Sequence, residues 1–531
     1  MEFNLADLFE SVVDTVPDRD ALVCGERRLT FAELDARANR LAHHLAGTGI
    51  GPGDHVGIQL YNGPEYVETM LACLKLRAVP ININYRYVAA ELSYLYADAD
   101  LVGLVYDVEF DARVAGAASA LPASARLIAV GGPGLPGAES YEDVLAAASP
   151  DRGFPARSAD DLYVLYTGGT TGAPKGVIWR HEDLFFAGLG GGDPMGEPVK
   201  TPTELAERVA ASYPLVMFPV APLMHGAAQL ATFIGFFGGR KVVLVRRFDP
   251  AEVLRAIARE KANVANIVGD AMARPLAEAL AGPLAGTDLS SLIAISSAGA
   301  ILSQSVRDTL GALLPNTVLL DNFGASESGF NGTGVAGSSP ESGLRFTVNA
   351  RTSVLDEQLR PVEPGSDVVG HVAQRGHVPL GYYKDPKKTA EVFVEVDGER
   401  WVLLGDLARV EADGTVHVLG RGAVCINSGG EKIFPEEVEA VLKAHPAVFD
   451  AVVAGVPDAT YGERVAAVVQ LRPELDRPEP PELDAHCRER LSGYKVPRSY
   501  VVAEEIRRSP SGKPDYRWAR QTAADAAAPA H

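Results

Sequence analysis

A stretch rich in glycine and threonine, residues 166–176, combines residue types that suit the binding of a polyphosphate. Its sequence is Y-T-G-G-T-T-G-A-P-K-G. Glycines let the backbone turn its N–H groups toward an anion, threonine hydroxyls add donors, and Lys175 adds a positive charge. The flanking segments, 161–166 and 177–179, have the apolar character of short buried strands. We therefore interpret the stretch as a phosphate-binding loop between two strands rather than as a flexible surface hairpin.

A Walker A loop at this stretch and a dinucleotide-binding loop elsewhere in the chain are both disfavoured. The stretch is not a Walker A loop, because no Gly-Lys-Ser/Thr follows its glycines, and an ordinary P-loop NTPase is not expected. Residues 132–137 match G-x-G-x-x-G after a strand-like segment. However, Pro133 and Pro136 each remove an N–H that such a loop would direct at a pyrophosphate. This second pattern predicts a surface turn.

Length and composition bound the class of protein. A chain of 531 residues exceeds what one hydrophobic core usually organises, so two or more domains are expected. Its content of 47% apolar and 22% charged residues is typical of a globular protein. The net charge of −20 argues against nucleic acid and anionic membranes as partners. Any anionic substrate must be held by local positive charge and backbone N–H groups.

Cysteine spacing and the N-terminal sequence indicate the compartment. The four cysteines form no CxxC pair and have no histidine cluster beside them, so neither a metal site nor a disulfide framework is predicted. The first residues lack the basic and apolar regions of a signal peptide. No stretch approaches the roughly 18 apolar residues of a membrane span. We expect a cytoplasmic protein with no integral membrane association.

The pattern of elements predicts an α/β fold. Residues 30–33 form a capping box before an apolar helical pattern, residues 55–60 read as a strand, and Pro64 begins a second helix. Strands at 292–295 and 317–320 each lead into a polar, glycine-containing loop. Ligands bind at the carboxyl ends of strands in open α/β sheets. These two loops and the phosphate loop are therefore expected to converge on one nucleotide.

The second half of the chain changes character. Turn signals replace the strand–helix alternation over residues 349–420 and predict a small β-rich subdomain. A compact α+β segment follows, with a helix that begins at Pro435. The predicted division is a large N-terminal domain of two βα-layered subdomains plus the β-rich one, residues 1–420, then a hinge, 421–426, and a small mobile C-terminal domain, 427–531.

Several motifs together resemble those of the adenylate-forming superfamily, and of its acyl-CoA synthetases in particular. They occur in order along nearly the whole chain, at residues 167–176, 222–226, 323–327, 405–406, 420–421, 429–439 and 511–513. Residues 179–183 and 425–432 carry a closer resemblance to actinobacterial ligases for bulky polycyclic acids, such as steroid side-chain acids. The resemblance implies that a carboxylate attacks Mg-ATP to give acyl-adenylate and pyrophosphate, after which coenzyme A displaces AMP.

The resemblance also implies the nucleotide site. Phe323 would stack on adenine, Asp406 would accept hydrogen bonds from both ribose hydroxyls, and Arg421 would hold ribose or phosphate from the hinge. Glu327, with Thr167, would bind Mg²⁺, a cation that prefers oxygen ligands. The full ATP- and AMP-binding set is Thr167, Gly168, Gly169, Thr170, Thr171, Gly172, Lys175, Ala298, Gly299, Ala300, Asp321, Asn322, Phe323, Gly324, Ala325, Ser326, Asp406 and Arg421.

Further residues are assigned to the reaction on the same grounds. Lys513 resembles the family lysine that bridges the carboxylate and the α-phosphate, and a primary ammonium is a compact charge able to touch both. With Lys513, His225 and Glu327 are the predicted catalytic residues, and His225 resembles the gate between the acyl pocket and the thiol tunnel. The predicted coenzyme A-binding residues are Ser428, Gly429, Gly430 and Lys432. The predicted acyl pocket comprises Phe218, His225, Gln229 and Gly269.

The sequence departs from the family pattern at the hinge. Many members carry Lys-Asp after the Gly-Arg pair, whereas this chain has Ala423 and Val424. Which residue pivots is therefore open. Leu404 replaces a threonine before Gly405, and Ser326 replaces a threonine before Glu327.

Three functions are compatible with these motifs. The first is an acyl-CoA ligase that uses ATP, Mg²⁺ and coenzyme A on a hydrophobic, bulky small-molecule carboxylic acid, with no nucleic-acid partner. The second is a stand-alone adenylating enzyme that loads an acyl carrier protein or another acceptor. The third, a non-catalytic nucleotide-binding module, is disfavoured by the presence of Lys513 and Glu327. The identity of the acid and the oligomeric state, including a homodimer, stay open.

Overall fold

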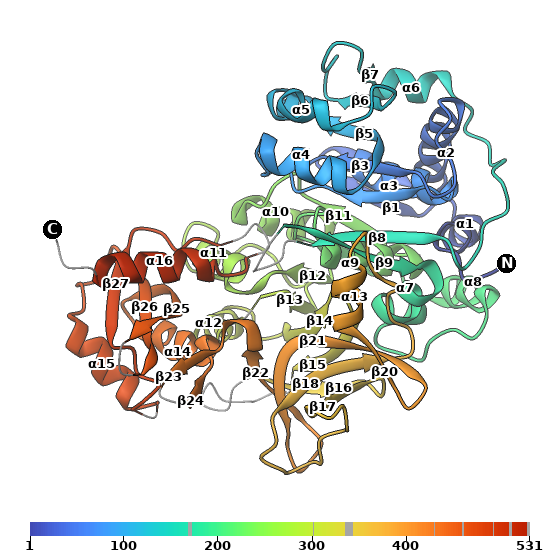
Figure 1. Cartoon of the computed structure of the whole chain (residues 1–531). Coiled ribbons are helices and arrows are strands. Elements are labelled where there is room, and N and C mark those ends of the chain that lie inside the picture. The colour runs from blue at the N-terminus through green and yellow to red at the C-terminus, as the bar shows by residue number, and fades with distance from the viewer. Residues whose placement is uncertain are drawn as a thin grey trace.

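The computed structural model describes most of the chain: residues 1–167, 173–300, 302–334, 344–428, 431–458, 461–491, 493–508 and 512–527. In these ranges the chain forms two large sheets covered by helices and a third, smaller sheet near the C-terminus (Figure 1). The predicted α/β class is confirmed. None of the described helices is both long and apolar enough to cross a membrane.

One sheet carries the phosphate stretch. Its strands are β3 (His55–Gln59), β4 (Val79–Asn82), β5 (Leu101–Asp107), β6 (Arg126–Val130), β7 (Glu139–Ser140), β8 (Leu162–Thr167), β9 (Lys175–Arg180) and β19 (Gly381–Tyr382). Within the described residues their order is β19-β9-β8-β4-β3-β5-β6-β7. Strands β8 and β9 pair antiparallel from Leu162 with Arg180 to Thr167 with Lys175. The end of β8 and the start of β9 therefore lie side by side, as predicted for the two strands that flank the phosphate stretch.

The other large sheet joins parallel and antiparallel strands. They are β1 (Asp20–Cys24), β2 (Arg27–Thr30), β10 (Val216–Pro219), β11 (Lys241–Leu244), β12 (Val264–Ile267), β13 (Ala294–Ala298), β14 (Val318–Ala325), β15 (Gly329–Gly334), β16 (Leu344–Val348), β17 (Thr352–Leu355), β18 (Gly370–Arg375), β20 (Phe393–Val396), β21 (Glu399–Val410) and β22 (Val416–Arg421). Through the described residues hydrogen bonding runs β17-β18-β21-β22-β16-β15-β14-β13-β12-β10-β11-β1-β2, with β20 on β21. The β-rich region thus extends the parallel sheet.

Strand β14 differs from the sequence prediction. We expected the strand to end at Leu320 and residues 321–325 to form a loop, but β14 continues to Ala325. It pairs in parallel with β13 up to Asn322 and then antiparallel with β15. Gly324 permits the second pairing, because a Cβ at this position would lie 2.2 Å from the carbonyl oxygen of Gly329. The strand therefore carries the parallel half of the sheet into the antiparallel half.

Helices cover both large sheets. They are α1 (Leu5–Thr15), α2 (Phe31–Gly47), α3 (Pro64–Lys75), α4 (Ala89–Asp98), α5 (Asp111–Ala117), α6 (Tyr141–Ala147), α7 (His181–Gly188), α8 (Pro202–Ala211), α9 (Gly226–Phe237), α10 (Pro250–Glu260), α11 (Gly269–Ala281), α12 (Gln304–Leu313) and α13 (Pro386–Val392). Thr30 and Glu33 form the predicted capping box at the start of α2. One apolar cluster includes residues of both sheets and of α1, α3 and α9, so the two sheets share a core.

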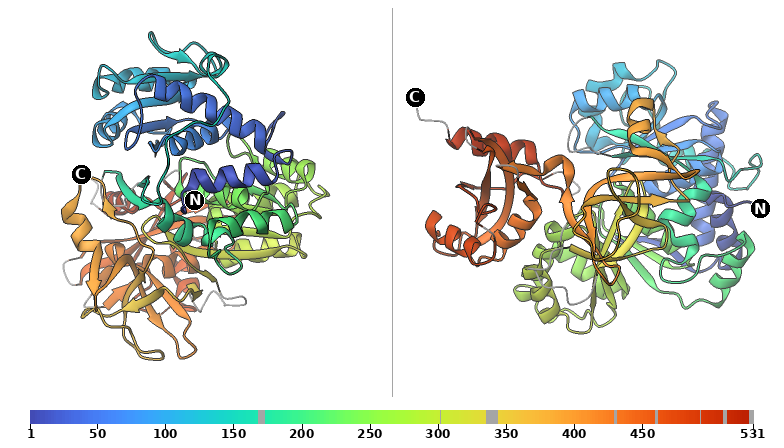
Figure 2. Two further views of the ribbon diagram at one scale, coloured as in Figure 1. Left: turned by 90° about the vertical axis from the view of Figure 1, so that its right-hand side faces the viewer. Right: turned by 60° about the horizontal axis from the view of Figure 1, so that its bottom comes forward.

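The C-terminal unit has its own sheet and core. Its elements are β23 (Ile426–Ser428), β24 (Glu431–Ile433), α14 (Pro435–Lys443), β25 (Val448–Asp458), β26 (Gly462–Leu471), α15 (Pro480–Arg488), β27 (Ser499–Ala503) and α16 (Tyr516–Ala527). Two apolar clusters draw only on residues between Ile426 and Ala524. This unit lies to one side of the molecule and follows β22 (Figure 2). The boundaries of the hinge stay a prediction.

Charged side chains connect the C-terminal unit to α11. Lys443 Nζ lies 3.4 Å from Asp270 Oδ2, and Arg472 lies 3.5 Å from Glu278. Two guanidinium groups lie close to the ring of Phe449, with Arg274 at 5.1 Å and Arg472 at 5.5 Å from its centroid. Polar contacts of this kind are typical of interfaces between domains that change orientation.

A glycine substitution tests the tight turn after β14. Gly329 has φ of 72°, and a Cβ there would lie 2.6 Å from the carbonyl oxygen of Ala187 in α7. We expect Gly329→Ala to destabilise the protein by more than the about 1–2 kcal/mol of a left-handed alanine alone, since backbone must also move. Gly414 has φ of 86° with open space around it, so Gly414→Ala is the matched control. Equal losses of apparent melting temperature in the two variants would contradict the close packing.

Candidate active site

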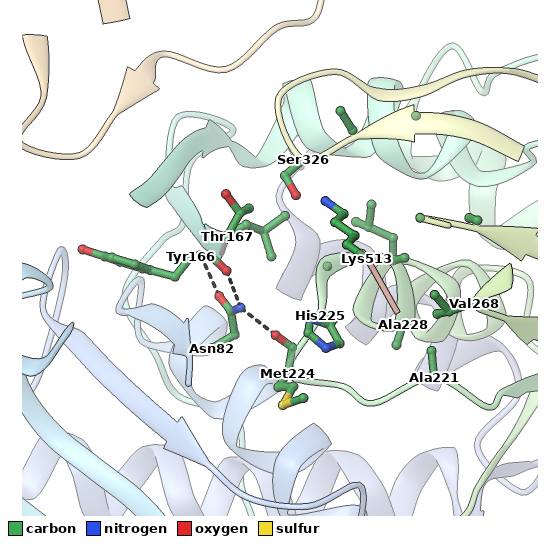
Figure 3. A pocket seen from close by; sticks show the side chains of 18 of the residues that line it. Asn82, Tyr166, Thr167, Ala221, Met224, His225, Ala228, Val268, Ser326 and Lys513 are labelled. Carbon is green, nitrogen blue, oxygen red and sulfur yellow. Dashed lines mark hydrogen bonds between the residues drawn. The ribbon is translucent and has the colours of Figure 1, made fainter. Parts of the chain in front are cut away.

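A cavity of about 810 Å³ lies where the carboxyl ends of β8, β13 and β14 meet (Figure 3). Thr167 ends β8, Ala298 ends β13 and is followed by Gly299, and residues 322–325 end β14 and are followed by Ser326; all line the cavity. The three segments that the sequence predicts to converge therefore do so. Residues 168–172 lie outside the described residues.

Two asparagines hold the segments that form the cavity floor. Asn82 donates from Nδ2 to the carbonyl oxygens of Tyr166 and Met224, both at 2.8 Å, and accepts from the N–H of Tyr166 at 2.8 Å (Figure 3). Asn62 similarly accepts from the N–H of Leu223 at 2.7 Å. These amides tie the strand that enters the phosphate stretch to the segment before His225. The sequence analysis missed both, although an asparagine at the end of an apolar strand was a visible signal at Asn82.

The adenine-binding residues predicted at the end of β14 have defined partners. Phe323 lines the cavity and stacks on Phe346, with ring centroids 5.0 Å apart. Asn322 donates from Nδ2 to Ser296 Oγ at 2.7 Å, which links β14 to β13. Asp321 instead forms an ion pair with Arg307. Burial raises the pKa of Asp321 despite this partner. Among the described residues, Asp321 and Ala300 are not part of the cavity wall.

Neither Lys175 nor Asp406 lines the cavity. Lys175 forms an ion pair with Asp385, and its hydrogen bond lowers the pKa of that carboxyl group. Its ammonium also lies 5.9 Å from the ring centroid of Tyr382. Asp406 is in β21, opposite Arg421 in β22. The structure therefore brings Asp406 and Arg421 together at the start of the predicted hinge.

Lys513 enters the cavity from the C-terminal unit (Figure 3). The neighbouring Arg508 positions it: Arg508 donates to both carboxylate oxygens of Asp450 at 2.7 Å and to the carbonyl oxygen of Gly512 at 3.0 Å. Burial would raise the pKa of Asp450, but the hydrogen bonds and charge of Arg508 outweigh burial and lower it. A half-buried, bidentate pair thus fixes the backbone beside Lys513.

Helix α9 forms much of the apolar wall. His225 stands immediately before it and lines the cavity. The wall residues of α9 are Gly226, Ala227, Ala228, Leu230, Ala231 and Ile234. Small side chains on this face leave the cavity wide. The sequence did not indicate which side of α9 lines a cavity, because nearly all of its residues are apolar.

Three residues predicted for the acyl pocket lie elsewhere. Phe218 is fully buried in the core, and Gly269 begins α11; neither lines the cavity. Gln229 faces the core, where its amide donates to Tyr66 Oη at 3.0 Å and to the carbonyl oxygen of Leu223 at 2.7 Å. The apolar runs around Phe218 and Gln229 are explained by core packing instead, and of the four predicted residues only His225 lines the cavity.

The predicted Mg²⁺ site offers oxygen donors. Glu327 is half-buried and accepts a hydrogen bond from Tyr382 Oη at 3.0 Å, and Thr167 lines the cavity. In the described part of the chain no three His, Cys, Asp or Glu side chains form a complete metal cage. Mg²⁺ usually takes one or two carboxylates together with water and substrate phosphates, so the chemistry of this donor set fits it, although Glu327 itself is not part of the cavity wall.

The predicted coenzyme A-binding residues lie in the first hairpin of the C-terminal unit. Ser428 ends β23 and pairs with Glu431 at the start of β24. Lys432 belongs to β24, while Gly429 and Gly430 lie outside the described residues. In the described part, this hairpin contributes nothing to the cavity wall. Of the described residues, Lys513 therefore lines the cavity and those of the hairpin do not.

Comparison with known proteins shows the family. Residues 9–383 match the AMP-binding enzyme family, and residues 437–513 match the AMP-binding enzyme C-terminal domain. The medium/long-chain-fatty-acid–CoA/3-oxocholest-4-en-26-oate–CoA ligase of Mycobacterium marinum is 49% identical over 531 residues, covering 98% of this chain and 96% of its own. The 3-oxocholest-4-en-26-oate–CoA ligase of Rhodococcus rhodochrous is 49% identical over 533 residues, with the same coverage.

A solved structure of an ATP-bound protein has a similar fold. ATP-bound MatB from Rhodopseudomonas palustris is 26% identical and superposes with a TM-score of 0.82, covering 99% of this chain and 100% of MatB. The two family matches and the 49% identical relatives together identify an adenylate-forming enzyme. The chain belongs to the AMP-binding enzyme family, and its resemblance to actinobacterial acyl-CoA ligases is confirmed.

The Arg508 contacts generate a prediction about Lys513. In Arg508→Lys the bidentate pair and the hydrogen bond to Gly512 are lost, so Lys513 is held less well. We therefore expect the adenylation rate to fall by about tenfold or more. The measurement is ATP–pyrophosphate exchange. Arg520→Lys is the control, because Arg520 forms an exposed pair with Glu463 in the same unit. An exchange rate equal to that of the control would contradict the positioning role.

Proposed function

We propose that the protein is an ATP-dependent acyl-CoA ligase for a bulky hydrophobic carboxylic acid. It joins the acid to AMP with release of pyrophosphate and then transfers the acyl group to coenzyme A with release of AMP. The observation that carries the proposal is the entry of Lys513 into the same cavity as the three strand-end segments. Both half-reactions depend on charge stabilisation and positioning more than on a protein nucleophile.

Adenylation requires two anions to meet. The Lys513 ammonium contacts the incoming carboxylate and the α-phosphate and reduces the repulsion between them. Residues 167–175 hold the β- and γ-phosphates, for which Lys175 must exchange Asp385 for phosphate oxygens. Glu327 and Thr167 hold Mg²⁺, which when bound neutralises phosphate charge. Phe323 stacks on the adenine, and Asp406 accepts from the ribose hydroxyls.

Thioester formation uses the other orientation of the C-terminal unit. After adenylation the unit rotates about residues 421–426, withdraws Lys513 and brings the hairpin that contains Ser428 and Lys432 to the cavity. His225 stands between the acyl wall and the path of the thiol. Polar contacts between α11 and the unit support a reversible docking of this kind.

The wall of α9 supports a bulky acid. Its glycine and alanines leave room in a cavity of about 810 Å³, within the range of sites that bind sizeable ligands. The relatives at 49% identity carry names that include medium- and long-chain fatty acids and the steroid acid 3-oxocholest-4-en-26-oate. We propose the same class, a polycyclic or long-chain acid, for this chain. The net charge of −20 argues against a nucleic-acid partner, and a cytoplasmic location is part of the proposal.

Mass spectrometry tests the function and names the acid class. The purified enzyme is mixed with Mg-ATP, coenzyme A and a panel of fatty, aromatic, steroid and diterpenoid acids. We expect an acyl-CoA product from a polycyclic or long-chain acid, together with AMP. Formation of neither AMP nor acyl-CoA across the panel would contradict the proposal. Acyl-adenylate without thioester would instead favour a carrier protein as the acceptor.

Substitution of Lys513 separates the two half-reactions. Lys513→Ala removes the charge that adenylation needs, and we expect a loss of about 10²-fold or more in pyrophosphate exchange. Attack of coenzyme A on preformed acyl-adenylate is expected to proceed at the rate of the unsubstituted enzyme. Lys495→Ala is the control, since Lys495 pairs with Glu437 on the surface of the same unit. Equal loss of both half-reactions in Lys513→Ala would refute the assigned role.

A further inference from the structure

The turn that carries Glu327, residues 326–328, is held from three sides. Trp179 Nε1 donates to the carbonyl oxygen of Ser326 at 2.9 Å, and Tyr382 Oη donates to Glu327 Oε1 at 3.0 Å. On the side of the β-rich strands, Gln374 Nε2 donates to the carbonyl oxygen of Ser328 at 2.6 Å. Each residue of the turn therefore has its own external partner.

The third contact belongs to a closed ring of buried hydrogen bonds. Ser328 Oγ donates to Asn331 Oδ1 at 2.5 Å, Asn331 Nδ2 donates to Gln374 Oε1 at 2.7 Å, and Gln374 returns the bond to Ser328. All three side chains are fully buried. The ring has one arrangement only, because the Ser328 carbonyl can accept but not donate, which fixes both amides.

Core packing alone does not explain this ring. Buried amides lose their hydration, and apolar residues of similar volume would fill the same space without needing partners. None of Ser328, Asn331 and Gln374 lines the cavity, so they do not bind a ligand there. A satisfied polar network is instead suited to fixing one unique geometry. What it fixes is the turn, through the oxygen and the hydroxyl of Ser328.

Close backbone packing completes the support. A Cβ on Gly329 would clash with the carbonyl group of Ala187 in α7, and one on Gly324 would clash with the carbonyl oxygen of Gly329. The backbone on both sides of residues 326–328 is thus confined by other backbone. Only the direction of the peptide groups within the turn is left for the hydrogen bonds to decide.

We propose that Gln374 is a positioning residue, which holds the turn so that Glu327 presents its carboxylate to magnesium-bound phosphate. Gln374 acts through Ser328 and touches neither nucleotide nor acid. This inference rests on the proposed function, because it assumes that Glu327 serves a magnesium–nucleotide complex. Partners one step removed from a metal ligand typically contribute 10–100-fold to metal affinity.

The test compares nucleotide binding with and without magnesium. Calorimetry measures the dissociation constant of the non-hydrolysable analogue AMPPNP in excess Mg²⁺ and in EDTA, with no acid present. Gln374→Met keeps the side-chain volume but removes both hydrogen bonds of the amide. In this variant we expect the AMPPNP dissociation constant to rise by about tenfold or more in Mg²⁺ and to stay unchanged in EDTA. Gln59→Met is the matched control, since Gln59 is a fully buried amide in the other large sheet that accepts from Tyr96.

Each outcome decides between the inference and its basis. If Mg²⁺ raises the AMPPNP affinity of Gln374→Met as much as that of Gln59→Met, the positioning role of Gln374 is overturned, while the proposed function is not. Absence of any magnesium-dependent gain in the unsubstituted enzyme would overturn the proposed function as well. If Gln374→Met does not fold, Trp179→Phe removes the donor to Ser326 from the opposite side. The same selective loss is expected from it, and an unchanged gain would count against the held turn.

Discussion

Electrostatic repulsion between two anions is the constraint on which the rest of this structure depends. A carboxylate must approach a triphosphate inside a protein whose own net charge is −20. The positive charges come from distant parts of the chain, with Lys175 at the start of β9 and Lys513 in the C-terminal unit. Lys175 is balanced by Asp385, whereas Lys513 is supplied by a unit that docks through polar contacts. In the proposed rotation, this charge is delivered for adenylation and withdrawn for thioester formation.

Positioning in this site relies heavily on amide side chains. Asn82 and Asn62 hold the floor of the cavity, and Gln374 and Asn331 hold the turn that carries Glu327. Amides donate and accept without carrying charge, so they fix backbone beside a polyphosphate without adding repulsion. Glycines play the complementary part where the backbone of one element must touch that of another, as at Gly324 and Gly329. The amide hydrogen bonds and the close-packed glycines together hold the part of the site that is built from the two large sheets.

Much of the fold could be predicted from the sequence, because its signals are local. The capping box at Thr30, the helices that begin at Pro64 and Pro435, and the strands around the phosphate stretch depend on neighbouring residues. Long-range pairing was not visible. Strand β14 was expected to end at Leu320, but its pairing with β15 extends it. Gln229 was expected in the acyl pocket, but which side of an apolar helix faces a cavity depends on the packing of distant elements.

The interface at α11 gives the enzyme a sensitivity that its active site does not share. The pair of Arg472 and Glu278 is partly open to solvent, so dissolved ions weaken it, whereas Lys443 and Asp270 are more enclosed. Both contacts hold the orientation that presents Lys513. Rising ionic strength thus weakens the pair of Arg472 and Glu278 first, because the other two pairs, Lys443 with Asp270 and Arg508 with Asp450, are more enclosed. In the proposed rotation, the salt content of the surroundings therefore biases how the enzyme divides its time between its two half-reactions.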